Sequence, residues 1–402
     1  MEEPPERDNV TERLYYHDSR LLEFEARIVS VAREGERYAI TLDRSAFYPT
    51  SGGQLHDTGA INGIPVVEVI EVGDEVVHFT ATAPGSVGES VHGVVDATRR
   101  RQHCRQHTAQ HILSQAFFRL FGKMTVSVHL GEEYGAVELG DDELDWPQCE
   151  QAEDLANRIV AENRPITTGF YTDAELQGLP LRKPPARTGK VRVVTIKDYE
   201  CTGCGGTHCA STAEVGVIKL VGLERLRRHT LVKFLCGQQA LADYSVRWRA
   251  TDSLSRRMTC HPRDLPARVD QLEQKLRSVQ RELVQLHRDR LPSLATAIAS
   301  RRPTGRTVVG ERVDLPDDKL VTELVKLTAA AAEAPALLLH EGRLFLAVPD
   351  GGRFDAGDLA RRLAAAGQLR GGGNKSLANL GPADPQNLSA YLDQLEKIIG
   401  DV

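Results

Sequence analysis

The chain has 402 residues, more than one core usually organises, so we expect two or three domains. Hydrophobic residues make up 41% of it, and no apolar run approaches the roughly 18 residues that a membrane span needs. The net charge of −6 argues against indiscriminate nucleic-acid binding, which depends on phosphate neutralisation. The first ten residues lack the basic start and apolar stretch of a secretory signal, so we expect a cytoplasmic protein that contacts no membrane.

Short β-rich runs separated by glycine-bearing turns fill the first part of the chain. They occupy residues 27–31, 38–42, 66–72 and 75–82. We therefore predict that residues 1–95 form a small N-terminal β-barrel.

The pattern then changes to a mixture of helices and strands. A long helix is predicted over residues 97–121 and a second over 147–163, with strands at 126–130, 135–139 and 190–196. A further strand and helix are expected to end near residue 249. Residues 96–250 are thus predicted to be a central α/β domain.

A heptad-like apolar stripe marks residues 251–300. It consists of Leu265, Val269, Leu272, Leu276, Val279, Leu283 and Leu286. The stripe fits either a helix packed on its own domain or a coiled-coil arm, with a possible homodimer contact through residues 265–286. Pro292 is expected to close this helix. Residues 301–402 alternate strands and helices, which predicts a small C-terminal α/β domain and an α+β multidomain fold overall.

Two histidines in the first long helix, His107 and His111, are four residues apart and therefore share one helix face. Two neutral imidazoles so placed can bind one cation. A zinc peptidase helix would carry glutamate directly after the first histidine, and here that residue is Thr108. The pair is therefore not a peptidase signature.

A second cluster contains three of the seven cysteines, in the stretch Cys201-Thr-Gly-Cys204-Gly-Gly-Thr-His208-Cys209. The two glycines permit a tight turn that aims Cys204 and His208 at one point, and thiolate with imidazole favours zinc over calcium or magnesium. A self-contained zinc knuckle of Cys201, Cys204, His208 and Cys209 is the alternative.

The two clusters together resemble the zinc motifs of the alanyl-tRNA synthetase editing domain and of its free-standing relatives, the AlaX-type alanyl-tRNA editing proteins. The resemblance extends to residues 47–54, 57–59 and 127–131, and to the glycine-rich residues 371–376 near the end. It covers the chain from about residue 25 onward. The tail resembles the DHH-associated domain of the long editing proteins and of the synthetases.

This resemblance implies that His107, His111, Cys204 and His208 bind Zn²⁺, with Cys201 outside the shared pattern. It also implies that the Gly52-Gly53-Gln54 loop borders the editing pocket, with Gly52 and Gly53 binding substrate and Gln54 in a catalytic role. Thr125 and Ser127 match more loosely. A hydroxyl at these positions suits recognition of a serine side chain, and we assign Thr125 to catalysis and Ser127 to substrate binding.

The implied activity is zinc-dependent deacylation of mischarged alanine tRNA, removing serine and also glycine in trans. Editing is needed because a pocket for alanine cannot exclude glycine sterically and rejects serine only modestly. Zinc would either activate the attacking water or position the substrate. No aminoacylation or nucleotide-hydrolysing portion is expected. The rival functions are a non-catalytic tRNA-binding protein with structural zinc, and editing of another tRNA, such as threonine tRNA carrying serine.

Two acid-free basic segments offer contacts to tRNA phosphates. The first contains Arg99, Arg100, Arg101 and Arg105, and the second runs from Arg182 to Lys197 and includes Arg187 and Lys190.

Overall fold

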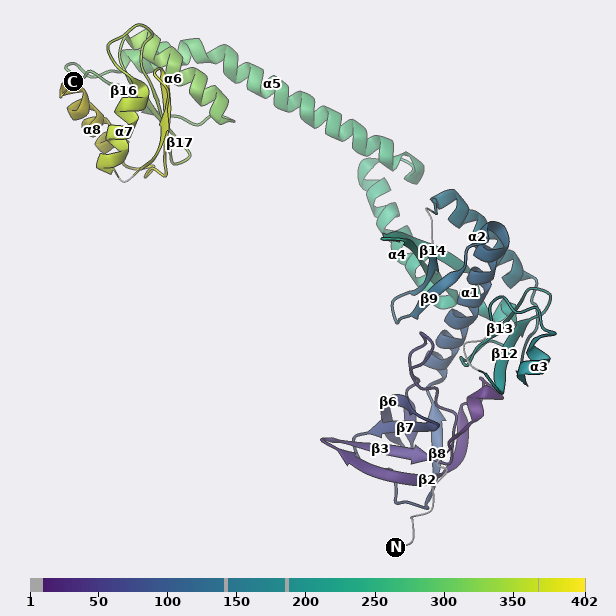
Figure 1. Cartoon of the computed structure of the whole chain (residues 1–402). Coiled ribbons are helices and arrows are strands. Elements are labelled where there is room, and N and C mark those ends of the chain that lie inside the picture. Colours follow the sequence, from purple (N-terminus) through teal and green to yellow (C-terminus); the bar gives the residue numbers. More distant parts are fainter. Residues whose placement is uncertain (1–9, 141–143, 185–187, 368, 402) are drawn as a thin grey trace. The chain divides into compact units, whose positions relative to one another are not determined.

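The computed structural model describes the chain apart from residues 1–9, 141–143, 185–187, 368 and 402. It divides into two compact units, Met1–Thr251 and Asp252–Val402, drawn in Figure 1. Both units combine helices with sheets, which confirms a mixed α+β multidomain architecture. Within the described part of the chain, every helix is too short or too polar to cross a membrane.

The N-terminal strands close into a six-stranded barrel, as the sequence predicts. The strands follow in the order β2 (Glu23–Glu34), β3 (Arg37–Leu42), β7 (Glu75–Thr80), β6 (Ile64–Val72), β5 (Gly59–Ile61) and β8 (Ser90–Val95). Exposed and buried side chains alternate along β8, because successive residues of a strand point to opposite faces. Two short strands, β1 (Glu12–Arg13) and β4 (Arg44–Ser45), pair in parallel beside the barrel.

Helix α1 (Ala97–Phe121) links the barrel to the rest of the first unit (Figure 1). It begins at Asp96, whose carboxylate accepts the N–H groups of Thr98 and Arg99, and it ends at Gly122 with φ at 67°. Its apolar side packs against a four-stranded sheet in the order β14 (Ile218–Leu226), β15 (His229–Cys236), β10 (Gly135–Gly140) and β9 (Thr125–Leu130). Helix α2 (Trp146–Ala161) packs on the same core.

A three-stranded sheet brings the cysteine-rich segment to α1. Its strands are β11 (Ile166–Tyr171), β12 (Val191–Ile196) and β13 (Glu200–Gly203), and the one-turn helix α3 (Asp173–Leu176) follows β11. The Tyr199 hydroxyl donates to the Ile112 carbonyl at 2.9 Å, which fixes the start of β13 against the middle of α1. Residues about a hundred positions apart in sequence thereby become neighbours.

The second unit contains a five-stranded sheet in the order β16 (Val309–Arg312), β17 (Ala336–His340), β18 (Arg343–Ala347), β20 (Leu377–Gly381) and β19 (Arg370–Gly373). Helices α6 (Asp318–Ala332), α7 (Ala356–Gly367) and α8 (Leu388–Gly400) pack on the sheet. Helix α4 (Gly237–Met258) crosses the division between the units, and α5 (Leu265–Ser300) belongs to the second unit.

The prediction that Pro292 closes the long helix is wrong, because α5 continues through it to Ser300. A proline inside a helix costs about 3 kcal/mol. Burial of Leu291, Ala295 and Ile298 against α6 offsets that cost. Earlier in α5, the apolar side chains of the stripe from Val269 to Leu286 are 42% to 63% exposed. Among the described residues, this stripe is therefore not packed against its own domain. The homodimer contact through residues 265–286 stays a prediction.

Candidate metal centre

Four side chains from two distant segments meet inside the first unit. His107 and His111 come from α1, and Cys204 and His208 come from the loop after β13. One ligand atom of each lies within 4.8 Å of the others, and Cys204 Sγ is 3.4 Å from Nε2 of both His107 and His208. A single tetrahedral ion with ordinary zinc bond lengths separates its ligand atoms by about 3.4–3.6 Å. The cluster can therefore hold a metal ion.

The imidazoles of His107 and His111 are fixed from behind. Nδ1 of His107 lies 2.7 Å from Gln54 Oε1, and Nδ1 of His111 lies 2.8 Å from Glu200 Oε2. Because both oxygens accept a hydrogen bond, each Nδ1 carries the proton and each Nε2 is left free. The rings are thus oriented before any ion binds.

Thr108 stands where a zinc peptidase would carry its glutamate base, and here it holds the second segment. Its Oγ1 lies 3.3 Å from Nδ1 of His208 and accepts the N–H of Cys209 at 3.1 Å. This side chain therefore tethers the cysteine loop to α1.

The electrostatics of the cluster favour a thiolate. Burial alone would raise the pKa of Cys204, but the His107, His208 and His111 imidazoles around it hold that pKa well below its usual value. Burial alone would lower the pKa of His111. The negative charges of Glu200 and Cys204 outweigh burial, so the pKa of His111 is raised. A thiolate among neutral imidazoles is the donor set that metals bind. Cys204 already favours its thiolate, and His111 would release its extra proton on binding an ion.

Glycine is required at position 206 because a side chain would collide with His107, and not because the backbone needs a conformation that only glycine adopts. Neither Gly205 nor Gly206 has a left-handed φ. A Cβ on Gly206 would lie 2.0 Å from His107 Cε1, so any side chain there would displace a ligand. Arg192 fixes the loop by donating through Nη1 to the carbonyls of Cys204 at 2.8 Å and Gly206 at 2.9 Å.

The alternative knuckle built from neighbouring cysteines is not formed. Side chains alternate along β13, so Glu200 faces the metal cluster while Cys201 points away and packs with Leu176 and Val193. Cys209 packs into the main core of the first unit. Sequence reasoning missed Glu200, although counting back by twos from Cys204 would have placed it on the ligand side.

A cavity of about 260 Å³ opens beside His107, His111 and Cys204, which line it. Its walls also include Gly52, Thr125 and Val128, whereas His208 is outside the lining. Gly53 lies behind this wall: its φ is 83°, and a Cβ there would meet the Val128 carbonyl oxygen at 2.5 Å. Ser127, predicted to bind substrate, is exposed and outside the cavity lining.

Gln54 and Thr125 differ in their relation to this cavity. Gln54 is fully buried outside its lining, where its Oε1 faces His107 Nδ1 and its Nε2 donates to Thr207 Oγ1 at 2.9 Å. It can therefore reach the cavity only through the His107 imidazole. Thr125 lines the cavity and donates to Ser114 Oγ at 2.8 Å, which leaves the lone pairs of its own oxygen free to accept.

One arginine assigned to RNA contact is structural. Arg100 is 1% exposed and forms an ion pair with Asp57, which is fully buried, and it also donates to the carbonyls of Ser19 and Ala46. The prediction is wrong for Arg100, because its guanidinium has no surface from which to reach a phosphate. Arg187 lies outside the described residues.

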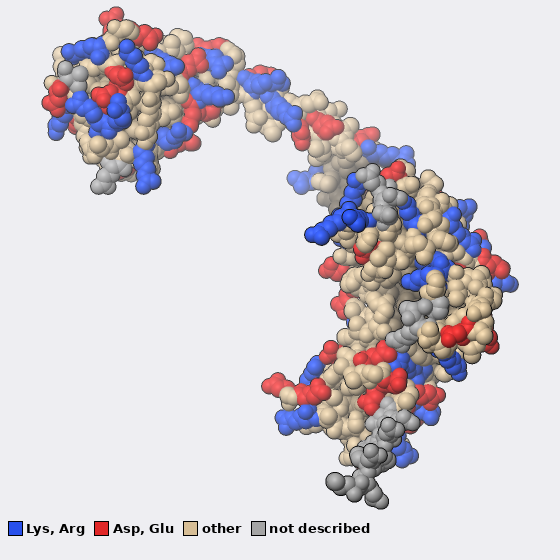
Figure 2. All heavy atoms as spheres, in the orientation of Figure 1, with Lys and Arg blue, Asp and Glu red and all other residues tan. Residues whose placement is uncertain are grey.

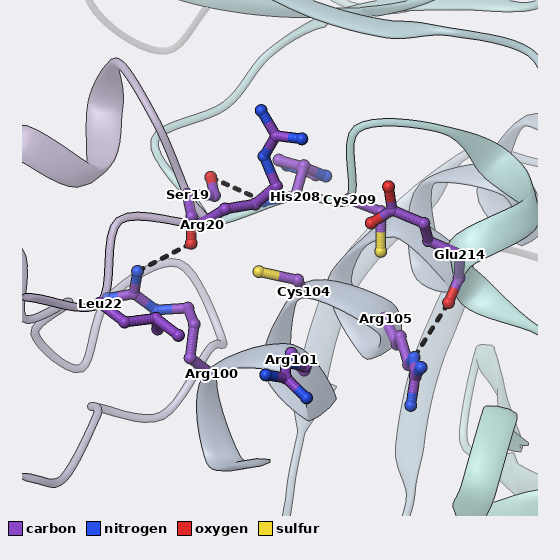
Figure 3. Close-up of a pocket in the computed structure, with 10 residues that line it drawn as sticks. All are labelled: Ser19, Arg20, Leu22, Arg100, Arg101, Cys104, Arg105, His208, Cys209 and Glu214. Carbon is purple, nitrogen blue, oxygen red and sulfur yellow. Dashed lines mark hydrogen bonds between the residues drawn. The ribbon is translucent and has the colours of Figure 1, made fainter. Parts of the chain in front are cut away.

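The remaining basic residues differ in how free they are. Arg99 pairs with Glu132 at 2.9 Å. Arg101 and Arg105 line a separate pocket of about 290 Å³, which His208 also lines and where Arg105 donates to the Glu214 carbonyl (Figure 3). Lys190 is exposed, with its Nζ 5.4 Å from the centre of the Phe170 ring. Basic and acidic side chains are interspersed on the face seen in Figure 2.

Comparison with known proteins identifies the family of this chain. Family models match residues 5–99 as tRNA synthetases class II (A) and residues 191–230 as the threonyl and alanyl tRNA synthetase second additional domain. The alanyl-tRNA editing protein AlaX-L of Pyrococcus horikoshii is 33% identical over 287 residues, which cover 67% of this chain and 68% of that protein. The chain therefore belongs to the family of alanyl-tRNA editing proteins, which are related to alanyl-tRNA synthetases.

The ligases themselves match over more of this chain but less of their own length. The alanine–tRNA ligase of Archaeoglobus fulgidus is 31% identical over 384 residues, which cover 92% of this chain and 42% of the ligase. The chain thus spans less than half of that relative. Among solved structures, the RecJ protein of Thermus thermophilus covers 35% of this chain at 15% identity with a TM-score of 0.25, which is too low to define a shared fold.

Proposed function

We propose that this protein is a zinc-dependent hydrolase that removes serine, and also glycine, from mischarged alanine tRNA. The observation that carries the proposal is the convergence of His107, His111, Cys204 and His208, the first three of which line a cavity, in a chain that belongs to the alanyl-tRNA editing family. A purely structural ion would need no adjoining cavity.

The donor set fits zinc. Three imidazoles and one thiolate suit a borderline-soft ion, and hard cations such as magnesium prefer oxygen ligands. When bound, zinc supplies Lewis acidity that lowers the pKa of a coordinated water or polarises a carbonyl.

The chain's own residues would orient and select the substrate. Gln54 and Glu200 hold His107 and His111 in place and are positioning residues in this scheme. We assign Thr125 to recognition of the serine side chain. Its Oγ1 can accept a hydrogen bond that the serine hydroxyl donates. Alanine has no such hydroxyl, so its ester would lose one hydrogen bond, a difference of about 1 kcal/mol or more.

Binding of tRNA in this proposal uses cations near the site. The candidates are the exposed Arg101 and Lys190 and the half-buried Arg105, and Arg99 can join them by exchanging Glu132 for a phosphate. Such contacts fix the position of the acceptor end without reading its bases.

The test is hydrolysis of purified seryl-, glycyl- and alanyl-tRNA for alanine, and of seryl-tRNA for threonine. We expect fast release of serine from alanine tRNA and little release of alanine. Deacylation no faster than the uncatalysed rate would refute the enzyme, and preference for threonine tRNA would correct the substrate.

Metal dependence is tested with a matched pair of cysteine variants. Cys204→Ser should lose the bound zinc and the activity, whereas Cys201→Ser should keep both, because Cys201 packs away from the cluster. Equal zinc loss in the two variants would contradict the proposed ligand set.

A further inference from the structure

Two polar groups of the cavity lining have no hydrogen-bond partner among the described residues. They are Nη1 of Arg182 and Oγ1 of Thr202. The Arg182 side chain is 4% exposed and Thr202 is 2% exposed, so both groups depend on what occupies the cavity for their missing hydrogen bonds. A buried group left unsatisfied costs roughly 1–3 kcal/mol, and more when it is charged. Two such groups in one cavity point to a bound molecule that completes them.

Arg182 is aimed by the same carboxylate that orients a metal ligand. Its Nε donates to Glu200 Oε1 at 2.9 Å, and the other oxygen, Oε2, lies 2.8 Å from Nδ1 of His111. A guanidinium is planar and rigid, so fixing Nε also fixes the direction of Nη1. The free N–H of Arg182 is therefore set in a constant position relative to the His111 ring.

Thr202 faces the cavity because side chains alternate between the two faces of β13. It lies two residues after Glu200 and two before Cys204, so all three share the face that is turned toward α1. Its hydroxyl can donate and accept. A small uncharged group thus lies on the same wall as the Arg182 guanidinium.

The chemistry of these groups limits what they can bind. A guanidinium N–H only donates, and its positive charge repels the ammonium group of an amino acid. It accommodates an oxygen that carries, or develops, negative charge. In an aminoacyl ester that oxygen is the carbonyl oxygen, and the ribose hydroxyl beside the ester bond is an uncharged polar group close to it.

We propose that Arg182 Nη1 donates to the ester carbonyl oxygen and to the oxyanion it becomes, and that Thr202 bonds the neighbouring ribose hydroxyl. This inference rests on the proposed function. Water adds to the carbonyl carbon, and the displaced electron pair moves to the oxygen beside Arg182. The oxyanion's electron pair then re-forms the carbonyl as the carbon–oxygen bond to the ribose breaks, and the ribose oxygen takes that bond's electron pair and the proton that the water released. The products are the free amino acid and tRNA with its terminal hydroxyl restored.

The test uses Arg182→Met, Arg182→Lys and Thr202→Val in the full chain, with zinc content and the rate of serine release measured for each. Loss of one oxyanion donor lowers kcat by about 10²–10³-fold, so we expect that decrease for Arg182→Met, with KM little changed. Arg182→Lys keeps a cation beside Glu200 but lacks the second donor, so kcat should still fall about tenfold with zinc retained. For Thr202→Val, kcat should fall about tenfold because one hydrogen bond to the substrate is lost. Arg37→Met, which breaks an exposed ion pair on the barrel, is the control expected to leave the rate unchanged.

The outcomes separate the two proposals. A zinc-replete Arg182→Lys protein with the wild-type kcat overturns the role of Arg182 and leaves the proposed function standing. Loss of activity that tracks loss of zinc and returns fully when zinc is added also overturns it, because Arg182 would then serve only to support His111. A wild-type protein that hydrolyses none of the aminoacyl-tRNAs contradicts the proposed function and this inference together.

Discussion

Replacing Arg100 by methionine should destabilise the first unit strongly without touching the metal centre. Arg100 and Asp57 are 1% and 0% exposed. The substitution leaves the Asp57 carboxylate with the Tyr48 N–H at 2.7 Å and a distant His103 at 3.7 Å. Breaking a buried ion pair from one side costs about 3–5 kcal/mol. In a unit of this size, that corresponds to a fall in melting temperature of roughly 6–20 °C.

The assay is thermal unfolding followed by tryptophan fluorescence. Both tryptophans of the chain, Trp146 and Trp248, lie in the first unit, so the signal reports that unit. Arg101→Met is the matched control: this neighbour on α1 is exposed, and its loss should weaken tRNA binding while leaving the melting temperature unchanged. The double variant Arg100→Met with Asp57→Asn should regain part of the loss. An unchanged melting temperature in Arg100→Met would refute the structural role.

Further predictions concern the ligand loop, the barrel and α5. Gly206→Ala should retain the fold but lose zinc, since its Cβ would overlap the His107 ring; full zinc occupancy by elemental analysis would contradict this. Burial lowers the pKa of His78 to about 4, against 6.5 for an exposed ring, so the unfolded chain binds a proton first as pH falls. Stability should therefore drop by about 2 kcal/mol between pH 7.5 and 5, and His78→Gln should lack this part of the pH dependence in urea unfolding. If the α5 stripe joins two copies, wild-type protein should sediment as a dimer and Leu276→Glu as a monomer, and a monomeric wild type would sink that prediction.

Local patterns in the sequence were sufficient to predict most elements. The helix over residues 97–121 agrees with α1, because Asp96 and Gly122 supply its two ends, and the barrel strands followed from β-rich runs between glycine-bearing turns. The spacing of His107 and His111 placed them on one helix face for the same local reason. Pro292 failed as a helix end because packing against α6, which no local pattern records, offsets its cost.

Only the tertiary structure decided which residues serve the site. Glu200 meets His111, and Arg182 meets Glu200, because β13 pairs with β12 and lies against α1, a contact between segments about ninety residues apart. Arg100 and Arg101 are adjacent in sequence and have the same chemistry, yet one is buried in an ion pair and the other is exposed. The sequence determines which groups are available and their local geometry. Whether a charged side chain is buried, and which group it pairs with, depends on segments distant in sequence. Burial and pairing then decide whether the charge stabilises the fold or is free to contact a substrate.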